Sequence, residues 1–259
     1  MGGAGAPDFF YREAQRLGYV ARSAFKLLQI QKQYKLITPG SSVLDLGCAP
    51  GAWLQVACQN LGSIKNGGSV VGIDVKKVKV PSLHCDARVK TFCADVMNLP
   101  KHQVKALSPQ HEGFSVILSD MCPPVSGITT KDAALSVELG MQAVDLAVGG
   151  AASAYAGGDT EPNELSDSAC GADDNGILQA GGHLLVKLLE SEDIQGGINF
   201  YVDNHYCVLQ CVSDLHFGSC FVEFSRICKP LFRKVSWLRP KATRSSSREI
   251  YLICQGLKL

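Results

Sequence analysis

Two lysines and two acids have the residue types and surroundings that acid–base chemistry needs. Asp120 ends an apolar run and is followed by Met-Cys-Pro-Pro, which continues neither a strand nor a helix. Lys187 lies inside an otherwise aliphatic run, where lysine is seldom buried without a partner. Glu249 opens the last apolar run, and Lys26 lies in a helical stretch near the N-terminus. Such a set could orient a weakly nucleophilic hydroxyl group and help to remove its proton.

The sequence leaves the roles of this set open. Asp120 could be a turn-forming residue, and Lys187 could be an edge-strand lysine whose ammonium group reaches water. In a shared site, burial and the nearby cation of Lys26 would favour a neutral Lys187 that acts as a base, whereas Asp120 would favour a charged one. A charged Lys187 would instead orient the hydroxyl and stabilise the negative charge that develops on its oxygen.

Apolar runs that alternate with helical stretches must position these residues. Residues 44–51, Leu-Asp-Leu-Gly-Cys-Ala-Pro-Gly, have the pattern of a strand, a tight turn and the start of a helix. Small residues let a backbone approach a ligand closely, and the first strand of an open α/β sheet delivers its loop to the ligand crevice. The turn is therefore a candidate cofactor loop. The expected strands cover residues 42–46, 69–74, 89–93, 113–120, 181–189 and 248–254.

Three acids near this loop indicate which cofactor it would hold. Asp74 ends the second apolar run, where a carboxylate can accept hydrogen bonds from ribose hydroxyls. Asp95 follows the third run and could accept a hydrogen bond from an exocyclic amine, so an adenosyl group fits both acids. Asp45 suits a cationic ammonium group and repels a pyrophosphate. The spacing of Gly47 and Gly51 also differs from the dinucleotide pattern G-x-G-x-x-G, so S-adenosylmethionine is favoured over NAD.

Five motifs that follow one another along nearly the whole chain resemble the FtsJ (RrmJ) family of S-adenosylmethionine-dependent RNA ribose 2′-O-methyltransferases. They read R-S-A-F-K-L-L-Q-I, V-L-D-L-G-C-A-P-G-A-W, S-D-M-C-P-P-V-S-G, G-G-H-L-L-V-K and S-S-S-R-E-I-Y. The resemblance implies an α/β fold of the Rossmann-like class I methyltransferase type, with a doubly wound, mostly parallel sheet of seven strands and helices on both faces. It implies a catalytic tetrad of Lys26, Asp120, Lys187 and Glu249. The cofactor site for S-adenosyl-L-methionine would include Asp45, Gly47, Pro50, Gly51, Trp53, Asp74, Asp95 and Asp120.

The resemblance also implies an RNA partner. The S-D-M-x-P-x-x-S-G string favours the branch that acts on large-subunit ribosomal RNA, commonly on a uridine. A tRNA anticodon-loop methyltransferase is the runner-up, because the R-S-A-F-K-L-L-Q-I string also suits that branch. A third alternative is an RNA-binding assembly factor that keeps the fold without turnover. By family analogy the protein would act in a mitochondrion or another organelle, with the cytoplasm as the alternative.

Composition favours a single methyltransferase domain over residues 1–259, because 46% of the residues are hydrophobic and strands alternate with helices. Two segments depart from the family pattern. One is an acidic insertion at about 149–176 that is expected to be flexible. The other, an apolar stretch at about 196–217, could form an extra element, cover the sheet or displace the helix that supports Lys187. A soluble monomer without a membrane span is expected, and eleven cysteines suggest reduced thiols.

A His/Cys cluster and two basic segments bear on metal and RNA binding. The spacing of His205, Cys207, Cys211 and His216 matches no usual ligand pattern, so no metal is expected. The net charge is only +1, yet basic residues concentrate in the first forty residues and in residues 226–248. Both segments are expected to flank the site and neutralise RNA phosphates, with an ordinary solvated face as the alternative.

Overall fold

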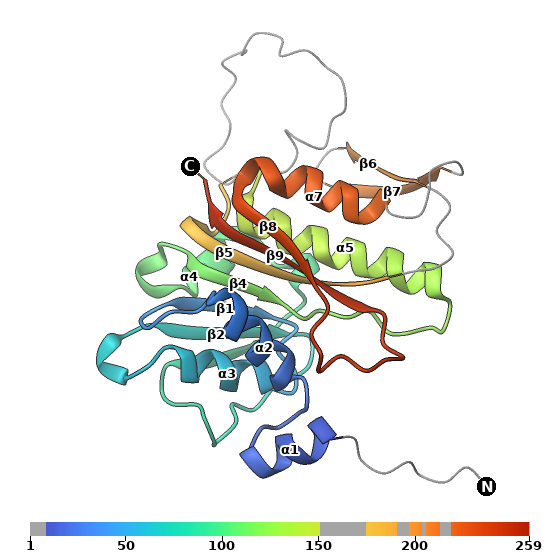
Figure 1. The fold of residues 1–259 in the computed structure, drawn as a ribbon. Coiled ribbons are helices and arrows are strands. Elements are labelled where there is room, and N and C mark those ends of the chain that lie inside the picture. Colours follow the sequence, from blue (N-terminus) through green and yellow to red (C-terminus); the bar gives the residue numbers. More distant parts are fainter. Residues whose placement is uncertain (1–8, 151–174, 191–196, 204–205, 213–218, 259) are drawn as a thin grey trace, which may run out of the picture.

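A mixed sheet of seven strands organises the protein, with the strand order β3-β2-β1-β4-β5-β9-β8 (Figure 1). The computed structural model describes residues 9–150, 175–190, 197–203, 206–212 and 219–258, of which 197–203, 206–212 and 219–223 are described by their backbone alone. The seven strands are β1 Ser42–Leu46, β2 Ser69–Asp74, β3 Val89–Cys93, β4 Phe114–Ser119, β5 Leu178–Leu189, β8 Phe232–Leu238 and β9 Glu249–Leu257.

The direction of the strands decides which chain segments meet at one edge. The first five, from β3 to β5, are parallel, whereas β9 runs antiparallel to both β5 and β8. The carboxyl ends of β1, β2, β4 and β5 therefore lie at the same edge as the amino end of β9. This is the seven-stranded, mostly parallel α/β fold that the motifs implied, and that expectation is confirmed.

Helices cover both faces of the sheet, and alternate strand residues form two separate cores (Figure 1). Leu185 and Tyr251 pack toward α2 and α3, whereas Leu184 and Leu252 pack toward α5 and α7. Buried aliphatic runs such as β1, whose five residues are all buried, are typical of strands covered on both faces. The α-helices are α1 Phe9–Leu17, α2 Ala24–Tyr34, α3 Ala52–Asn60, α4 Lys101–Ala106, α5 Thr129–Val148 and α7 Ser219–Leu231. Short 3-10 turns are η1 Ile64–Asn66, η2 Val96–Asn98 and η3 Pro109–His111.

The apolar stretch at 196–217 forms an extra element. Strands β6 Gly197–Asp203 and β7 Tyr206–Val212 pair antiparallel in a separate two-stranded sheet. The seven-stranded sheet does not include them, and α7 packs on β8 beyond them. The expected acidic insertion lies almost entirely outside the described residues. In the described ranges, no helix is both long and apolar enough to cross a membrane.

Candidate active site

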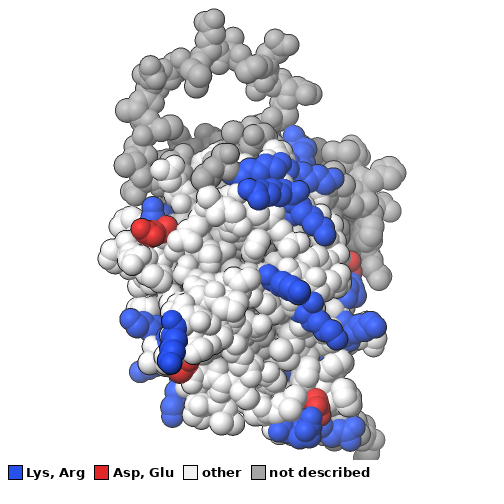
Figure 2. All heavy atoms as spheres, turned by 60° about the vertical axis from the view of Figure 1, so that its left-hand side comes forward, with Lys and Arg blue, Asp and Glu red and all other residues white. Residues whose placement is uncertain are grey.

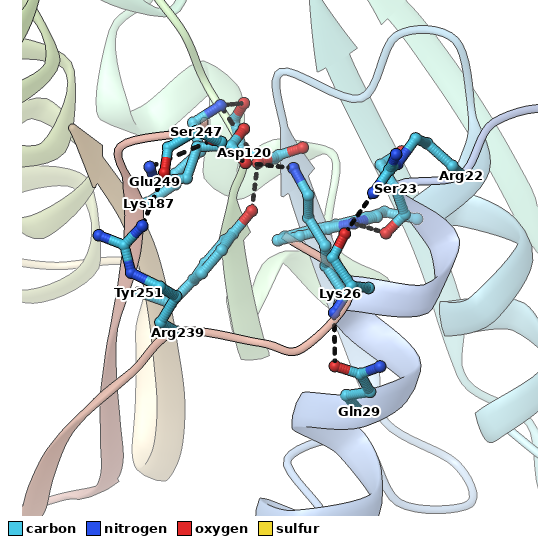
Figure 3. Close-up of polar contacts among 12 residues, drawn as sticks. Arg22, Ser23, Lys26, Gln29, Asp120, Lys187, Arg239, Ser247, Glu249 and Tyr251 are labelled. Carbon is cyan, nitrogen blue, oxygen red and sulfur yellow. Dashed lines mark hydrogen bonds and ion pairs between the residues drawn. The ribbon is translucent and has the colours of Figure 1, made fainter. Parts of the chain in front are cut away.

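The four residues of the expected tetrad converge at the edge where the parallel strands end (Figure 3). The Nζ atom of Lys187 lies 3.2 Å from Oδ1 of Asp120 and donates a hydrogen bond of 2.6 Å to the Asp120 backbone carbonyl. The Nζ atom of Lys26 lies 2.6 Å from Oε2 of Glu249. The sequence separates Lys26 from Glu249 by more than two hundred residues, so the fold alone brings this pair together.

Strand register explains how each residue reaches the site. Asp120 directly follows β4, and its backbone N–H donates to the carbonyl of Leu46 at the end of β1. On β5 and β9, Lys187 pairs with Tyr251, and the next pair on the same face includes Glu249. Because β9 is antiparallel, its first residues stand beside the last residues of β5. Lys26 reaches this face from α2, which packs on it.

Tyr251 belongs to the site although the sequence analysis missed it. Its hydroxyl donates a hydrogen bond of 3.1 Å to Oδ1 of Asp120, the oxygen that also faces Lys187. Burial raises the pKa of Tyr251 well above its ordinary value, and the charge of Asp120 adds to the shift, so the phenol is neutral. The ring centroid lies 6.0 Å from that of Trp53. The signal was present in the sequence, because Tyr251 follows Glu249 by two and a strand places such residues on one face.

The protonation of Lys187 depends on two opposing effects. Its side chain is only 3% exposed, and burial lowers the pKa of Lys187. The nearby anions, Asp120 above all, outweigh burial, so the pKa of Lys187 lies above the ordinary lysine value. Burial likewise raises the pKa of Glu249, but the charge and hydrogen bond of Lys26 lower it further than burial raises it. Lys187 is therefore protonated and Glu249 ionised at neutral pH in this structure.

A cavity of about 270 Å³ adjoins the tetrad and is lined in part by residues of the expected cofactor site. Gly47, Asp74, Asp95 and Asp120 line it. The same cavity is also lined by residues that the sequence analysis did not single out, among them Lys76, Met97, Met121 and Cys122. The close packing of the loop explains why residue 47 is a glycine, since its φ is +76° and an added Cβ would lie 2.8 Å from the Met121 backbone.

Four other residues of the expected cofactor site do not line this cavity. Pro50 is exposed and follows a cis peptide bond, and Gly51 is buried at the N-terminus of α3 with φ +109°. Trp53 is buried, and its indole N–H donates to the Ser23 carbonyl. Asp45 is fully buried at the end of β1. For the first three, the structure gives roles in shaping and packing the loop.

Asp45 is the most unusual polar group of the site. Neither of its carboxylate oxygens has a hydrogen-bond partner among the described residues. Burial raises the pKa of Asp45 well above its ordinary value, and the charges of Asp120 and Asp74 add to that shift. A buried carboxyl group without partners costs free energy, and a cationic or hydrogen-bond-donating ligand would remove that cost.

Asp74 and Asp95 are held in place by backbone N–H groups. Oδ2 of Asp74 accepts from the Ala49 N–H at 2.9 Å, and Oδ1 accepts from the Lys76 N–H at 2.8 Å. Oδ1 of Asp95 accepts from the Met97 N–H at 3.0 Å at the start of η2. These bonds fix both carboxylates at the cavity wall, and each oxygen keeps capacity to accept from a ligand.

A second buried acid fastens the loop that follows Asp120. Asp132 is fully buried and accepts hydrogen bonds from the Ser126 backbone N–H and hydroxyl at 2.8 and 2.7 Å. Arg248 lies 3.3 Å from Asp132 and donates to the carbonyls of Thr129 and Glu190. Arg248 directly precedes Glu249, so its contacts connect the start of β9 to the start of α5 and to the residue that follows β5. No pattern in the sequence alone pairs it with Asp132.

The suggested metal cluster is not described, because His205 and His216 lie outside the described residues and no side chain of β7 is described. Among the described residues, no three His, Cys, Asp or Glu side chains gather as ligands for a metal ion.

Comparisons with known proteins show the family to which the chain belongs. A relative from Syntrophobacter fumaroxidans, named Ribosomal RNA large subunit methyltransferase E, is 31% identical over 97% of this chain and 95% of its own. A relative of the same name from Desulfosudis oleivorans is 30% identical over 97% and 91%. A solved chain described as a ribosomal RNA methyltransferase from Plasmodium falciparum shares the fold, with a TM-score of 0.59, 20% identity and coverage of 92% and 98%. The FtsJ-like methyltransferase model matches residues 19–257. The resemblance inferred from the motifs is confirmed, and the chain belongs to the FtsJ-like methyltransferase family.

Proposed function

We propose that the protein transfers the methyl group of S-adenosylmethionine to a ribose 2′-hydroxyl of large-subunit ribosomal RNA, at a uridine. The observation that carries this proposal is the meeting of two largely buried ion pairs, Lys187 with Asp120 and Lys26 with Glu249, beside a cavity that Asp120 lines. The large-subunit ribosomal target is supported by the names of the two relatives.

The donor side fits a cationic adenosyl ligand. Asp74 and Asp120 lie close enough to interact electrostatically with Asp45, whose carboxylate oxygens have no hydrogen-bond partner among the described residues. These three acids give the region a negative potential, which suits a sulfonium and an ammonium group. Asp74 would accept from ribose hydroxyls and Asp95 from the adenine amine. Gly47 gives the loop the close backbone approach that a ligand in the cavity needs. S-adenosylmethionine, when bound, supplies a methyl group on a positively charged sulfur and leaves as a neutral thioether.

The acceptor side acts through position and charge. Lys187 is protonated in this structure, so we assign it the orienting role: its ammonium holds the 2′-oxygen and stabilises negative charge on that oxygen. Asp120 fixes the Lys187 ammonium and is the nearest carboxylate to receive the hydroxyl proton. Lys26 and Glu249 hold each other at the edge of the site, where Lys26 can contact the RNA backbone.

The test is methyl transfer from labelled S-adenosylmethionine, with large ribosomal subunits, free ribosomal RNA and bulk tRNA offered separately. Nucleoside analysis of the product should find the label in 2′-O-methyluridine from ribosomal RNA and none with Lys187→Ala. Label in tRNA alone would overturn the choice of substrate in favour of the anticodon-loop reaction. RNA that is bound but never labelled would overturn the enzyme assignment in favour of an assembly factor.

A further inference from the structure

The basic run at residues 226–248 does not flank the site as a whole, contrary to the expectation from sequence. Strand β8 carries the run along the sheet edge from one end to the other. Near the site, Leu238 pairs with Tyr251, whereas Lys234 pairs with Gln255 toward the opposite end of β9. From Glu249 to Gln255 is about 20 Å along the strand, at roughly 3.4 Å per residue. The first half of the run is therefore remote from the tetrad.

Cations from three elements gather at this remote end. Gln255 donates a hydrogen bond to the carbonyl of Tyr34, the last residue of α2, which brings Lys35 beside Lys234. Lys258 donates to the Lys229 carbonyl at the end of α7. We name this surface the basic edge, and its members are Lys32, Lys35, Lys229, Arg233, Lys234 and Lys258. Figure 2 shows a face on which Lys and Arg side chains gather, with acidic side chains only at its margins.

The basic edge differs from the active site in how its charges are balanced. At the site, Lys26, Lys187 and Arg248 each have an acidic partner. At the basic edge all six cations are exposed, and none forms an ion pair with any residue that the structure describes. Because successive strand residues point to opposite faces, Arg233 and Lys234 extend the basic edge to both sides of β8. Unpaired cations that gather around one end of a strand repel one another, which a folded protein tolerates at a cost in stability. A polyanion would remove that repulsion.

Protection of the exposed sheet edge is the simplest alternative explanation. Lysines on an edge strand discourage pairing with other chains, and β8 is such a strand. That account covers Arg233 and Lys234, but Lys32, Lys35 and Lys229 belong to α2, its C-cap and α7, where no free strand edge needs protection. Their gathering with the strand residues points to a shared ligand.

We propose that the basic edge binds the phosphate backbone of a second segment of the substrate RNA, about 20 Å from the methylated ribose. The proposal rests on the proposed function for its choice of RNA. Folded RNA presents closely spaced phosphates over such a distance, whereas a di- or trinucleotide seated in the active site is too short to reach the basic edge. The basic edge thus selects for a large folded substrate and contributes nothing to the chemistry of methyl transfer.

The experiment compares two triple variants of equal charge change. One carries Lys35→Gln, Arg233→Gln and Lys234→Gln, and the control carries Lys65→Gln, Lys79→Gln and Lys90→Gln, which are exposed lysines on the β2 and β3 side. The dissociation constant for a folded fragment of ribosomal RNA is measured against salt concentration by filter binding. The KM and kcat of methyl transfer are then measured for that fragment and for a short single strand that contains the target nucleotide.

The basic-edge variant should weaken binding of the folded RNA about tenfold and lower the slope of log K against log salt by about two, at roughly 0.7 per lost phosphate contact. KM should rise for the folded RNA alone, with kcat unchanged for both substrates. An equal effect in the control, an equal loss for the short strand, or unchanged binding would each overturn the proposal. If no RNA is methylated, the proposed function fails while the binding measurement still decides the basic edge.

Discussion

The donor half of the active site and the acceptor half differ in how far their polar groups are satisfied within the protein. On the acceptor half, each lysine has a carboxylate within 3.2 Å, and Tyr251 adds a hydrogen bond to Asp120. On the donor half, Asp45 is buried with no partner. The acceptor half is therefore preformed, whereas the donor half carries a cost that its ligand would relieve. This difference predicts that changes in the two halves affect different measured quantities.

The largest expected effect is on the acceptor half. Lys187→Ala removes the cation that fixes Asp120 and faces the hydroxyl, and kcat should fall about a thousandfold, within the range for loss of a positioned acid–base or charge-stabilising group. The affinity for S-adenosylmethionine, measured by calorimetry, should stay close to that of the unmodified protein. Lys90→Ala, at an exposed lysine of β3, is the matched control. A comparable loss of cofactor affinity in Lys187→Ala would erase the distinction between the halves.

The second prediction concerns the donor half, where one substitution should lower the affinity for the cofactor and raise the Tm of the free protein. Asp45→Asn should weaken S-adenosylmethionine binding about tenfold or more, because a charge-assisted hydrogen bond contributes roughly 1.5–3 kcal/mol. The same change should raise the Tm of the free protein, since an amide does not carry the cost of a buried ionised carboxyl group. Calorimetry and thermal unfolding on one preparation would check both signs. A lower Tm in the free protein would mean that Asp45 has a stabilising partner.

The pH dependence of the Tm gives a further test of the Asp45→Asn prediction. The folded pKa of Asp45 lies above its unfolded value of 3.8, so its contribution to stability is complete below that value and is lost as pH rises toward the folded pKa. The variant has no such loss, and the gap in Tm between the two proteins should widen as pH rises above about 4. Thermal unfolding across a pH series measures this gap. A gap that stays constant with pH would contradict the raised pKa.

A smaller effect is expected within the acceptor half. Tyr251→Phe removes one hydrogen bond to Asp120 and leaves the ring packed near Trp53, so kcat should fall about fivefold, corresponding to roughly 1 kcal/mol. Steady-state kinetics with saturating cofactor would measure it. A loss as large as that of Lys187→Ala would give the phenol a direct part in the reaction rather than a positioning one.

The smallest expected change is none at all. Because the pKa of Lys187 lies above the ordinary lysine value, its charge is constant at neutral pH, and kcat should be level between about pH 7 and 9. A kcat that rises tenfold per pH unit across this range would identify Lys187 as a base that must first lose its proton. That result would reverse the orienting role proposed for Lys187.

Much of this arrangement could be predicted from the sequence, because aliphatic runs and motif order specify the strands and the tetrad. The second strand ends at Asp74 as expected, and β4 ends at Ser119, one residue before the expected Asp120. Strand β8 was not foreseen, because exposed lysines and arginines on an edge strand produce no alternating apolar pattern. The pairing of Arg248 with Asp132 depends on contacts between residues more than a hundred positions apart, which no local pattern reveals.

The position of β9 has a consequence for the order in which the site can be assembled during synthesis. This strand lies between β5 and β8 and supplies Glu249 and Tyr251, yet the ribosome makes it after every other strand of the sheet. A nascent chain that still holds β9 in the exit tunnel lacks the partner of Lys26 and one neighbour of Asp120. Such a chain lacks Glu249 and Tyr251, so the acceptor half is complete only after the last strand emerges.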